Sequence, residues 1–479
     1  MQLTDFIAIS PLLMLTATCI FIMLQIALVR DHVFSAFLAL AGLAAALSAL
    51  PAAFQWRSEH VTALITVDAF SIFFTGLILA TAAAVVLLAL GYLKCIEGHC
   101  EEFFLLLMIA TLGACVLTSS RHFASFVLGL ETLSISLYTL IAYPRLRTES
   151  VEAGVKYLVL GTASSAFLLF GAALIYAFGG TLDFAEVAAQ RFAMAAPDRS
   201  SLLLAGIGMV VVGIGFKLAL VPFHMWAADV YQGAPAPVTA FVATISKTAM
   251  VALLVRLFAP IDVLATPAIF WVLASTAFAS MIAGNLLALR QTSVKRILAY
   301  SSIAHLGYLM TAFLSGGRSG VAAVMFYMVA YTVTSLGAFG VVSVLSHRES
   351  DADRLEDFRG LFYRKPWTAG VFAAMLLSLA GIPLTAGFFG KFFLVAAGAQ
   401  AHLWWLVITL VLASAVSLFY YLRIVVVIFT PKEEDEAQPL HPSSLDLPGS
   451  LVLGAMTLGL IWIGIWPDYL MNLIRIIAD

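Results

Sequence analysis

Long hydrophobic runs separated by short polar connections fill almost the whole chain. Most runs hold about 20 residues or more, the length with which a helix crosses a hydrocarbon core of roughly 30 Å. None has the short alternating pattern that is typical of strands in a membrane barrel. Backbone groups in lipid must find hydrogen bonds within their own segment, so helices remain as the spanning structure. The pattern therefore predicts an all-α integral membrane protein.

The hydrophobic runs divide into about fourteen transmembrane helices. Their approximate ranges are 6–29, 33–53, 64–93, 102–119, 122–143, 153–178, 201–222, 237–258, 266–289, 294–314, 319–346, 367–398, 402–430 and 448–473. An even number of spans places both termini on one side. With the N-terminus outside, the inner loops hold fifteen of the 25 lysines and arginines and the outer loops hold seven. The positive-inside rule therefore predicts that both termini face outward.

Composition agrees with this pattern and adds little about partners. Hydrophobic residues make up 62% of the 479, charged residues 11%, and the mean hydropathy is +1.03. A net charge of −2 indicates no nucleic-acid partner. No basic segment precedes the first run, so we expect it to be a helix and not a cleavable signal peptide. The stretch CIEGHC, with Cys95, His99 and Cys100, matches no standard zinc spacing, and we expect no metal.

Two of the expected helices, the seventh and the twelfth, are interrupted. The seventh breaks at Pro222 and the twelfth around Pro383 in LAGIPLTAG. Proline removes an intrahelical hydrogen bond, and broken helices at corresponding places are typical of inverted-repeat transporters. We therefore expect two inverted five-helix repeats, helices 4–8 and 9–13; a chance pair of prolines is the alternative. The expected segments are 1–101 with three helices, 102–262 and 263–433 with one repeat each, and 434–479 with helix 14.

Four ionisable residues lie well inside the expected spans: Glu131, Lys217, Lys247 and Lys391. A charged side chain at the centre of a bilayer costs about 2.5–3.5 kcal/mol on insertion scales, so such residues are rare and usually functional. Snorkelling to the surface and structural ion pairs are the alternatives. Burial favours a neutral amine, whereas a nearby carboxylate favours the ammonium. We therefore expect Glu131 to control whether Lys217 keeps its proton.

Polar residues recur on the same helix faces as these charges, at spacings of three, four and seven residues. The stripes are Glu131, Ser134 and Tyr138; Thr244 and Lys247; Ser301, His305 and Tyr308; Tyr327, Tyr331 and Thr334; Ser414, Ser417 and Tyr421. Hydroxyls and an imidazole in such rows can hold water and pass protons, and His305 suits this role near neutral pH. Simple helix-to-helix hydrogen bonding is the alternative. We expect His224 to bind carbonyls that the break at Pro222 frees.

The chain lacks the motifs of redox and nucleotide chemistry. It has no GxGxxG after a strand, no P-loop, no group of four cysteines for an iron–sulfur cluster and no paired histidines placed for haem. We therefore expect no cofactor in this chain. If the chain moves ions, the energy comes from an ion gradient or from a partner.

Several stretches resemble one known family. GFKLALVPFHMWAADVYQGAPAPVTAFVATISK, RILAYSSIAHLGYL, LSLAGIPLTAGFFGKFFL and GLETLSISLYTLIAY are similar to the antiporter-like membrane subunits of bacterial respiratory complex I, the proton-pumping NADH:quinone oxidoreductase. The resemblance covers essentially the whole chain. The part DVYQGAPAPV, a lysine at position 391 and the lack of a long lateral helix after the fourteenth span resemble subunit N rather than its sister subunits M and L.

The resemblance implies a set of roles. Glu131 and Lys217 would form a coupled pair, Lys247 the central relay and Lys391 the terminal one. FMN, iron–sulfur clusters and quinone would belong to partner subunits. The partners would be the other membrane-arm subunits, including the sister antiporter-like and the small ones, the lipid bilayer and protons, without nucleic acid. The location would be the bacterial inner membrane, with both termini periplasmic.

Two other interpretations remain open. The chain is alternatively a subunit of a multisubunit cation/proton antiporter that works without NADH, or a membrane-arm scaffold whose buried charges only hold helices together. The charged loop at residues 347–366 is interpreted as a solvated connector rather than a docking site.

Overall fold

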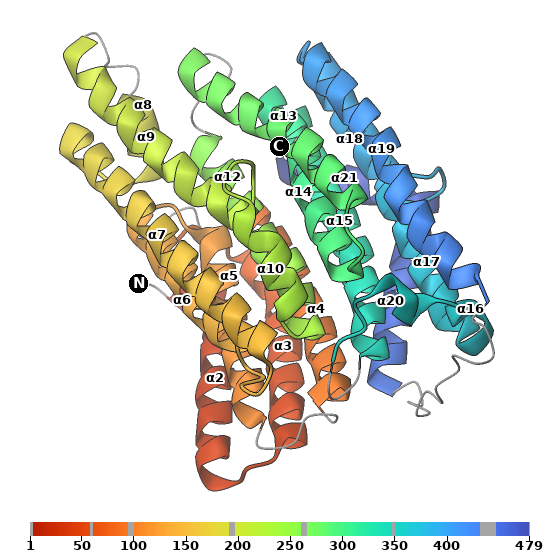
Figure 1. The fold of residues 1–479 in the computed structure, drawn as a ribbon. Coiled ribbons are helices and arrows are strands. Elements are labelled where there is room, and N and C mark those ends of the chain that lie inside the picture. The colour runs from red at the N-terminus through yellow and green to blue at the C-terminus, as the bar shows by residue number, and fades with distance from the viewer. Residues whose placement is uncertain are drawn as a thin grey trace. The chain divides into compact units, whose positions relative to one another are not determined.

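The computed structural model describes residues 3–57, 61–93, 100–190, 197–259, 266–346, 350–431 and 447–478. Helices account for almost all of this part (Figure 1). Within it, strand-like pairing is limited to isolated bridges such as Ile65 with Ser120. The longer helices are α2 Ser10–Leu28, α3 His32–Gln55, α4 Ala69–Leu93, α5 Glu101–Ser119, α6 Phe123–Ile141, α7 Thr148–Gly179, α9 Pro197–Leu218, α12 Lys247–Phe258, α13 Pro267–Leu289, α14 Val294–Ser315, α15 Gly317–Leu345, α17 Pro366–Ala380, α18 Ala386–Gln400, α19 Trp404–Phe429, α20 Leu447–Ile465 and α21 Pro467–Ala478. The shorter ones include α1 Leu3–Ala8, α8 Phe184–Gln190, α10 Met225–Gly233, α11 Ala236–Phe241 and α16 Leu361–Arg364.

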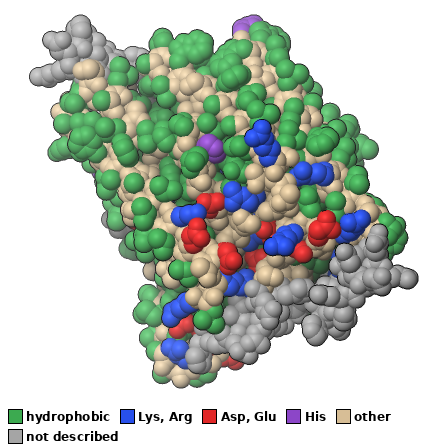
Figure 2. Space-filling model, in the orientation of Figure 1, with side chains coloured by type: hydrophobic (Ala, Val, Ile, Leu, Met, Phe, Trp, Pro, Cys, Tyr) green, Lys and Arg blue, Asp and Glu red, His purple; other side chains and the backbone are tan. Residues whose placement is uncertain are grey.

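The expected fold class is confirmed. In the described ranges, 13 helical segments are long and apolar enough to cross a membrane, and the broken twelfth span, α17 with α18, makes the fourteenth. On the face drawn in Figure 2, hydrophobic side chains cover most of the surface and charged ones gather in one region. A lipid-facing surface needs this distribution. One expected span, 448–473, is divided: α20 ends at Ile465, and Pro467 starts α21 because proline suits the first turn of a new helix.

The chain forms two compact units. The first contains Met1–Ala83, His99–Trp226 and Ile245–Leu273, and the second contains Ala84–Gly98, Ala227–Thr244 and Ala274–Asp479. In the first unit α5 packs on α6, and α7 packs along α9. In the second unit α15 is the central helix and packs against α14, α17, α18, α20 and α21.

Glycine lets α7 and α9 approach closely. A Cβ atom added at Gly206 would lie 2.9 Å from the carbonyl oxygen of Gly171, and one added at Gly171 would lie 2.7 Å from that of Gly206. Because hydrophobic burial does not drive association between helices in lipid, such close backbone contact supplies dispersion attraction instead. Lys217 lies at the end of α9, so this contact also fixes the backbone that carries it.

We expect Gly206→Val to lower the free energy of unfolding by about 1–3 kcal/mol, because the added side chain forces α7 and α9 apart. Thermal unfolding of the purified protein in detergent measures the loss. The matched control is Gly208→Val on the same helix, where an added Cβ meets nothing within 4 Å. Equal losses for the two variants would show that helix propensity, and not the close contact, sets the cost.

An ion pair ties the start of α4 to the end of α12 within the first unit. The two guanidinium nitrogens of Arg256 bind the two carboxylate oxygens of Asp68 at 3.0 and 2.8 Å, and its Nε donates to the carbonyl of Thr118. Burial raises the pKa of the Asp68 carboxyl, but the charge and hydrogen bonds of Arg256, together with hydrogen bonds from Ser71, outweigh burial and hold this pKa below its ordinary value. The ion pair therefore stabilises the folded state at pH values at which Asp68 is ionised.

We expect Asp68→Asn to lower the free energy of unfolding by about 1–3 kcal/mol at pH 7, since Arg256 loses its partner. A lowered pKa in the folded state means that the stabilisation is complete above the ordinary aspartate value of about 4 and is lost as the pH falls further. The difference between variant and wild type should therefore shrink from pH 7 to pH 3. Thermal unfolding at both pH values tests this, with Glu152→Gln in an exposed pair with Lys156 as control. A difference independent of pH would contradict it.

Candidate functional site

The structure buries the three lysines and the histidine singled out from the sequence. The exposed fractions are 2% for Lys217, 0% for Lys247, 7% for Lys391 and 3% for His305. Glu131, on α6, is half-buried. None of the three amines snorkels to the surface of the protein, so each needs hydrogen-bond acceptors inside it.

Serine hydroxyls bind both members of the expected Glu131–Lys217 pair. The Nζ of Lys217 donates to Oγ of Ser134 at 2.7 Å, and Oγ of Ser165 donates to the Glu131 carboxylate at 2.6 Å. Ser134 follows Glu131 by one helical turn on α6. In the described chain no direct ion pair within 4 Å joins Glu131 to Lys217. The carboxylate is therefore placed to influence the amine through space and not by a fixed contact.

The break in the seventh span lies at residues 219–224 and frees the last carbonyls of α9. Ala219, with φ of 57°, turns the chain out of the helix, and Pro222 lies within the break. Two side chains bind carbonyls at this end. Nζ of Lys247 donates to the carbonyl of Lys217 at 3.0 Å, and the indole N–H of Trp226 donates to that of Phe216 at 2.8 Å. The backbone N–H groups of Ala219 and Leu220 bind the carbonyls of Phe216 and Gly215, so backbone donors, an ammonium and an indole together satisfy the C-terminal end of α9.

His224 lies half-buried in the same break, and its Nδ1 has no hydrogen-bond partner within the described structure. From the sequence we expected His224 to bind carbonyls that the break frees, and the histidine hydrogen-bonds the backbone of Pro222 within the break. The carbonyls of Phe216 and Lys217 are bound by Trp226 and Lys247. Those two side chains lie where the helix ends, whereas His224 is on the connecting segment.

A π-helical segment, Val242–Ser246, directly precedes Lys247. π-Helical turns inside α-helices occur frequently at functional sites, because the extra residue re-aims the side chains that follow. The sequence pattern predicted an unbroken helix over 237–258 and gave no sign of this turn.

Lys391 in the second unit is bound in the same way at the other break. Its Nζ donates to the carbonyls of Leu379 and Ala380 at 2.8 and 2.9 Å and to Oγ of Ser414 at 2.7 Å. Those carbonyls end α17, just before the break at residues 381–385 that contains Pro383. Lys247 and Lys391 therefore both lie at the negative end of a broken helix, where a cation is favoured.

Hydroxyls surround His305 on both sides of its ring. Its Nδ1 lies 2.6 Å from the hydroxyl of Tyr327, and its Nε2 lies 3.2 Å from that of Tyr421. Tyr421 in turn hydrogen-bonds Ser301. The structure thus joins three of the stripes read from the sequence, on α14, α15 and α19. A ring with one nitrogen facing each hydroxyl can take a proton on one side and give it up on the other.

Other predicted polar residues divide into two groups. Tyr331 donates to Ser302 at 2.7 Å, and the ring of Tyr138 lies 5.7 Å from Nζ of Lys217. Thr244, Thr334 and Ser417 instead donate to carbonyls of their own helices. Such local bonds are ordinary for hydroxyls in membrane helices.

The sequence interpretation missed Asn285 on α13. Its side-chain nitrogen donates to the hydroxyl of Tyr308 at 2.9 Å, and its oxygen accepts from Tyr420 at 3.1 Å. The ring of Tyr308 lies 5.4 Å from Nζ of Lys391. An amide in the apolar run AGNLLAL was the available signal, because a polar group inside a span needs a buried partner.

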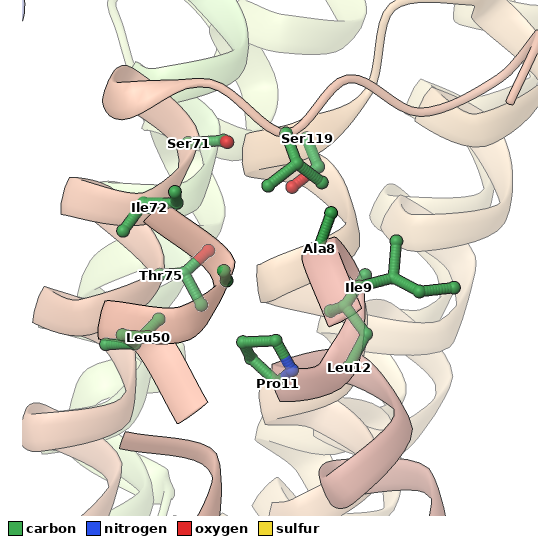
Figure 3. Close-up of a pocket in the computed structure, with 11 residues that line it drawn as sticks. Ala8, Ile9, Pro11, Leu12, Leu50, Ser71, Ile72, Thr75 and Ser119 are labelled. Carbon is green, nitrogen blue, oxygen red and sulfur yellow. The ribbon is translucent and has the colours of Figure 1, made fainter. Parts of the chain in front are cut away.

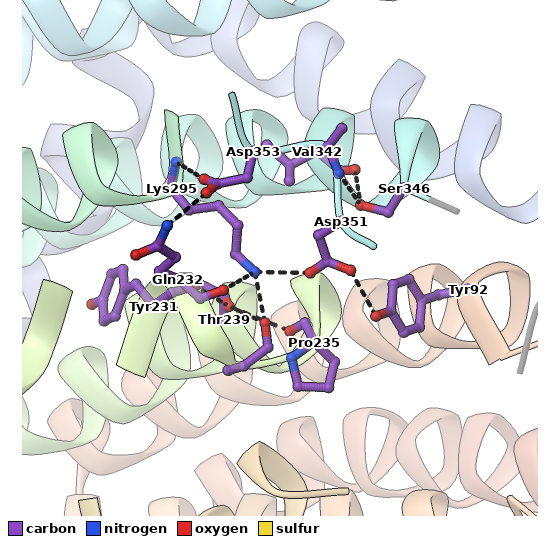
Figure 4. A network of polar contacts seen from close by, with 12 residues as sticks. Tyr92, Tyr231, Gln232, Pro235, Thr239, Lys295, Val342, Ser346, Asp351 and Asp353 are labelled. Carbon is purple, nitrogen blue, oxygen red and sulfur yellow. Dashed lines mark hydrogen bonds and ion pairs between the residues drawn. The ribbon is translucent and has the colours of Figure 1, made fainter. Parts of the chain in front are cut away.

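A fourth buried amine, Lys295 at the start of α14, was counted from the sequence as a loop residue. It binds the carbonyls of Gln232 and Ala234 at 2.8 and 2.7 Å and the carboxylate of Asp351 at 2.8 Å (Figure 4). Asp351 also accepts from the hydroxyl of Tyr92. Lys295 therefore has a fixed counter-charge and holds the Gly-Ala-Pro-Ala-Pro segment that follows α10.

The charged loop at residues 347–366 contributes the carboxylates that bind Lys295 and Gln232. Asp353 accepts from the side chain of Gln232 at 2.9 Å and from the backbone N–H of Lys295 at 3.1 Å. Asp351 is buried, unlike a residue of the solvated connector expected for 347–366. In its described part, from residue 350, this loop binds Lys295 and Gln232 through Asp351 and Asp353. Residues 347–349 lie outside the described ranges.

Two further features hold no identifiable chemistry. A cavity of about 20 Å³, the size of about one water, lies between α1, α2, the end of α3, the start of α4 and the end of α5 (Figure 3). Apolar side chains line most of it, with hydroxyls of Ser71, Thr75 and Ser119. In the described chain no group of three or more His, Cys, Asp or Glu could hold a metal ion. Cys95 and His99 lie outside the described residues.

Comparison with known proteins identifies the family of this chain. Residues 120–417 match the family described as NADH:quinone oxidoreductase/Mrp antiporter, TM. The chain is 34% identical to a chain of respiratory complex I from Thermus thermophilus with bound aureothin, over 96% of this chain and 98% of that one, with a TM-score of 0.81.

Two more solved structures share the fold. One is the membrane-bound sulfane sulfur reductase, an archaeal respiratory membrane complex: 24% identity, 99% of this chain and 97% of that one, TM-score 0.87. The other is the Mrp complex from Dietzia sp. DQ12-45-1b: 20% identity, 100% and 97%, TM-score 0.86. The family match covers more than half of the chain. The chain therefore belongs to the antiporter-like membrane subunits of the NADH:quinone oxidoreductase/Mrp antiporter family, which are parts of multisubunit membrane complexes.

Proposed function

We propose that this chain is a proton-translocating membrane-arm subunit of a complex I-type NADH:quinone oxidoreductase, equivalent to subunit N. One observation carries the proposal: Lys217, Lys247 and Lys391 are buried, and among the described residues only neutral oxygens bind their amines. An amine without a fixed counter-charge can lose its proton without leaving an unpaired carboxylate in a medium of low dielectric.

Lys295 provides an internal contrast. Its amine is as deeply buried, but Asp351 pairs with it at 2.8 Å, as a structural ion pair requires. Removing a proton from Lys295 would leave the buried carboxylate of Asp351 without its counter-charge, which is strongly unfavourable. The chain thus has both kinds of buried lysine, and the three at the helix breaks have the environment of a relay. This difference favours proton transfer over a purely structural role.

The relay has a separate part in each unit. In the first, Glu131 acts on Lys217, and the carbonyl of Lys217 holds Lys247. In the second, His305 lies between the hydroxyls of Tyr327 and Tyr421, and Lys391 ends the series. We assign these parts to two inverted five-helix repeats, residues 102–262 and 263–433. Protons enter from the cytoplasmic side and leave through Lys391 to the periplasmic side.

The energy comes from other subunits. NADH oxidation with FMN and iron–sulfur clusters, and quinone reduction, take place outside this chain, which carries no cofactor in this proposal. The chain spans the bacterial inner membrane with both termini periplasmic, beside the sister antiporter-like and small membrane subunits.

A subunit of a cation/proton antiporter is the second candidate, because the chain also shares its fold with a chain of an Mrp complex at a TM-score of 0.86. Mass spectrometry of the purified assembly separates the candidates. Companion chains that bind flavin and iron–sulfur clusters support the complex I assignment, and their absence from an active assembly supports the antiporter.

We expect Lys247→Ala to abolish proton translocation by this subunit while the complex still assembles, since the central acceptor of the relay is lost. Proton uptake per NADH oxidised by membrane vesicles measures translocation, and native electrophoresis measures assembly. Lys156→Ala, on an exposed part of α7, is the matched lysine control. Normal proton stoichiometry in Lys247→Ala would refute the relay, and loss of assembly in Lys217→Ala and Lys247→Ala alike would support the scaffold.

We expect Tyr327→Phe to slow proton translocation by about 10-fold or more, because the ring of His305 loses the hydroxyl at its Nδ1 and positioned proton transfer contributes factors of about 100 or more. Translocation rates in reconstituted vesicles measure the effect. Tyr363→Phe, at an exposed ring, serves as control. Unchanged rates in Tyr327→Phe would remove His305 from the relay.

A further inference from the structure

The relay lysines of the first unit share a group of four aromatic rings, which the sequence analysis did not single out as a group. The members are Tyr138 on α6, Tyr157 on α7, Phe216 on α9 and Trp226 on α10. The ring centroid of Trp226 lies 4.7 Å from that of Tyr157 and 5.4 Å from that of Phe216. Tyr157 and Trp226 each have at most 1% of their surface exposed, so water does not separate these rings.

Each amine lies against this aromatic group. The Nζ of Lys217 is 5.3 Å from the ring centroid of Tyr157 and 5.9 Å from that of Phe216. The Nζ of Lys247 is 5.0 Å from the ring centroid of Trp226. Ring faces attract a cation, most strongly where water is excluded, and Trp is the best of the three aromatic types for this. The group therefore stabilises an ammonium at either lysine without providing a carboxylate that would hold the proton there.

Trp226 adds a second contact that the other rings lack. Its indole N–H donates to the carbonyl of Phe216 at 2.8 Å, which also accepts from the backbone N–H of Ala219 at 2.9 Å. The carbonyl of the next residue, Lys217, accepts from Nζ of Lys247 at 3.0 Å. Trp226 thus binds the end of α9 beside the carbonyl that holds Lys247, and its ring lies close to the Lys247 ammonium.

We propose that Trp226 is a positioning residue for proton transfer between Lys217 and Lys247. The indole fixes the end of α9, and the ring holds the Lys247 ammonium beside the carbonyl of the residue from which its proton comes. This inference rests on the relay proposed above. It assigns to Trp226 no proton of its own, because the indole is a donor only and does not titrate.

Two substitutions separate the contributions of the ring and the N–H. Trp226→Phe keeps an aromatic face but removes the donor, and Trp226→Leu removes both. We expect Trp226→Leu to reduce this subunit's contribution to the protons translocated per NADH oxidised, measured as the excess over Lys247→Ala, by about tenfold, and Trp226→Phe by only about threefold, since the ring recovers part of the effect. Trp404→Leu, at an exposed ring on α19, is the control and should match wild type.

Stability measurements exclude a general loss of packing, because Lys247→Ala already removes translocation by this subunit and leaves no activity in which a second loss could be seen. Native electrophoresis and thermal unfolding of each variant show whether the complex remains assembled and stable.

The outcomes are distinct. If Lys247→Ala translocates protons normally, the relay itself is refuted. If Lys247→Ala is inactive but Trp226→Leu equals wild type, only the positioning role is overturned. Equal losses in Trp226→Phe and Trp226→Leu would overturn the part assigned to the ring. Failure of both Trp226 variants to assemble would make Trp226 a structural residue and overturn the proposal.

Discussion

The structure depends on how broken helices are satisfied inside a membrane. A helix that ends within the hydrocarbon region exposes carbonyl groups that no water can bind, and each unsatisfied group is costly. In this chain lysine amines occupy two such ends: Lys247 at the end of α9 and Lys391 at the end of α17. The break and the buried amine thus depend on each other. The amine donates hydrogen bonds to the free carbonyls, and the carbonyls supply the acceptors that a buried amine needs.

This arrangement accounts for the contrast between the buried lysines. Lys295 holds the segment after α10 with carbonyls and a carboxylate, and it serves as a fixed cross-link. Lys247 and Lys391 use carbonyls and a hydroxyl without a carboxylate. The same helix-end chemistry therefore gives a fixed cross-link when an acid is adjacent and, in the proposed relay, a titratable site when none is.

Much of the fold followed from hydropathy alone. Runs of sufficient length predicted the fourteen spans, and Pro222 and Pro383 predicted both breaks, because proline acts locally and independently of packing. The lysines were visible for the same reason: an ammonium in an apolar run needs no tertiary information to be noticed. The π-helical turn before Lys247 was not predictable, since no residue type demands it.

The hydropathy pattern could not predict which side chains contact each other between helices. Asn285 is a polar residue in an apolar run, but the sequence does not identify its partner Tyr308 on another helix, and it gives no sign that Trp226 binds the carbonyl of Phe216. Lys295 lies near a span end, where the charge rules place it in a loop; only the carbonyls of residues 232 and 234 show that it is buried. Sequence spacing finds residues on one helix face but does not identify the residue opposite.

The acceptors of Lys391 have a consequence for the energetics of proton release. Two carbonyls and a hydroxyl surround its nitrogen, and an amine that has given up its proton still carries two hydrogens that these oxygens can accept. The third oxygen loses its donor when the charge leaves, and of the three only the Ser414 hydroxyl can itself donate to the free lone pair of the amine. In the proposed relay, rotation of this one hydroxyl is therefore the rearrangement that restores a full set of hydrogen bonds around the neutral amine.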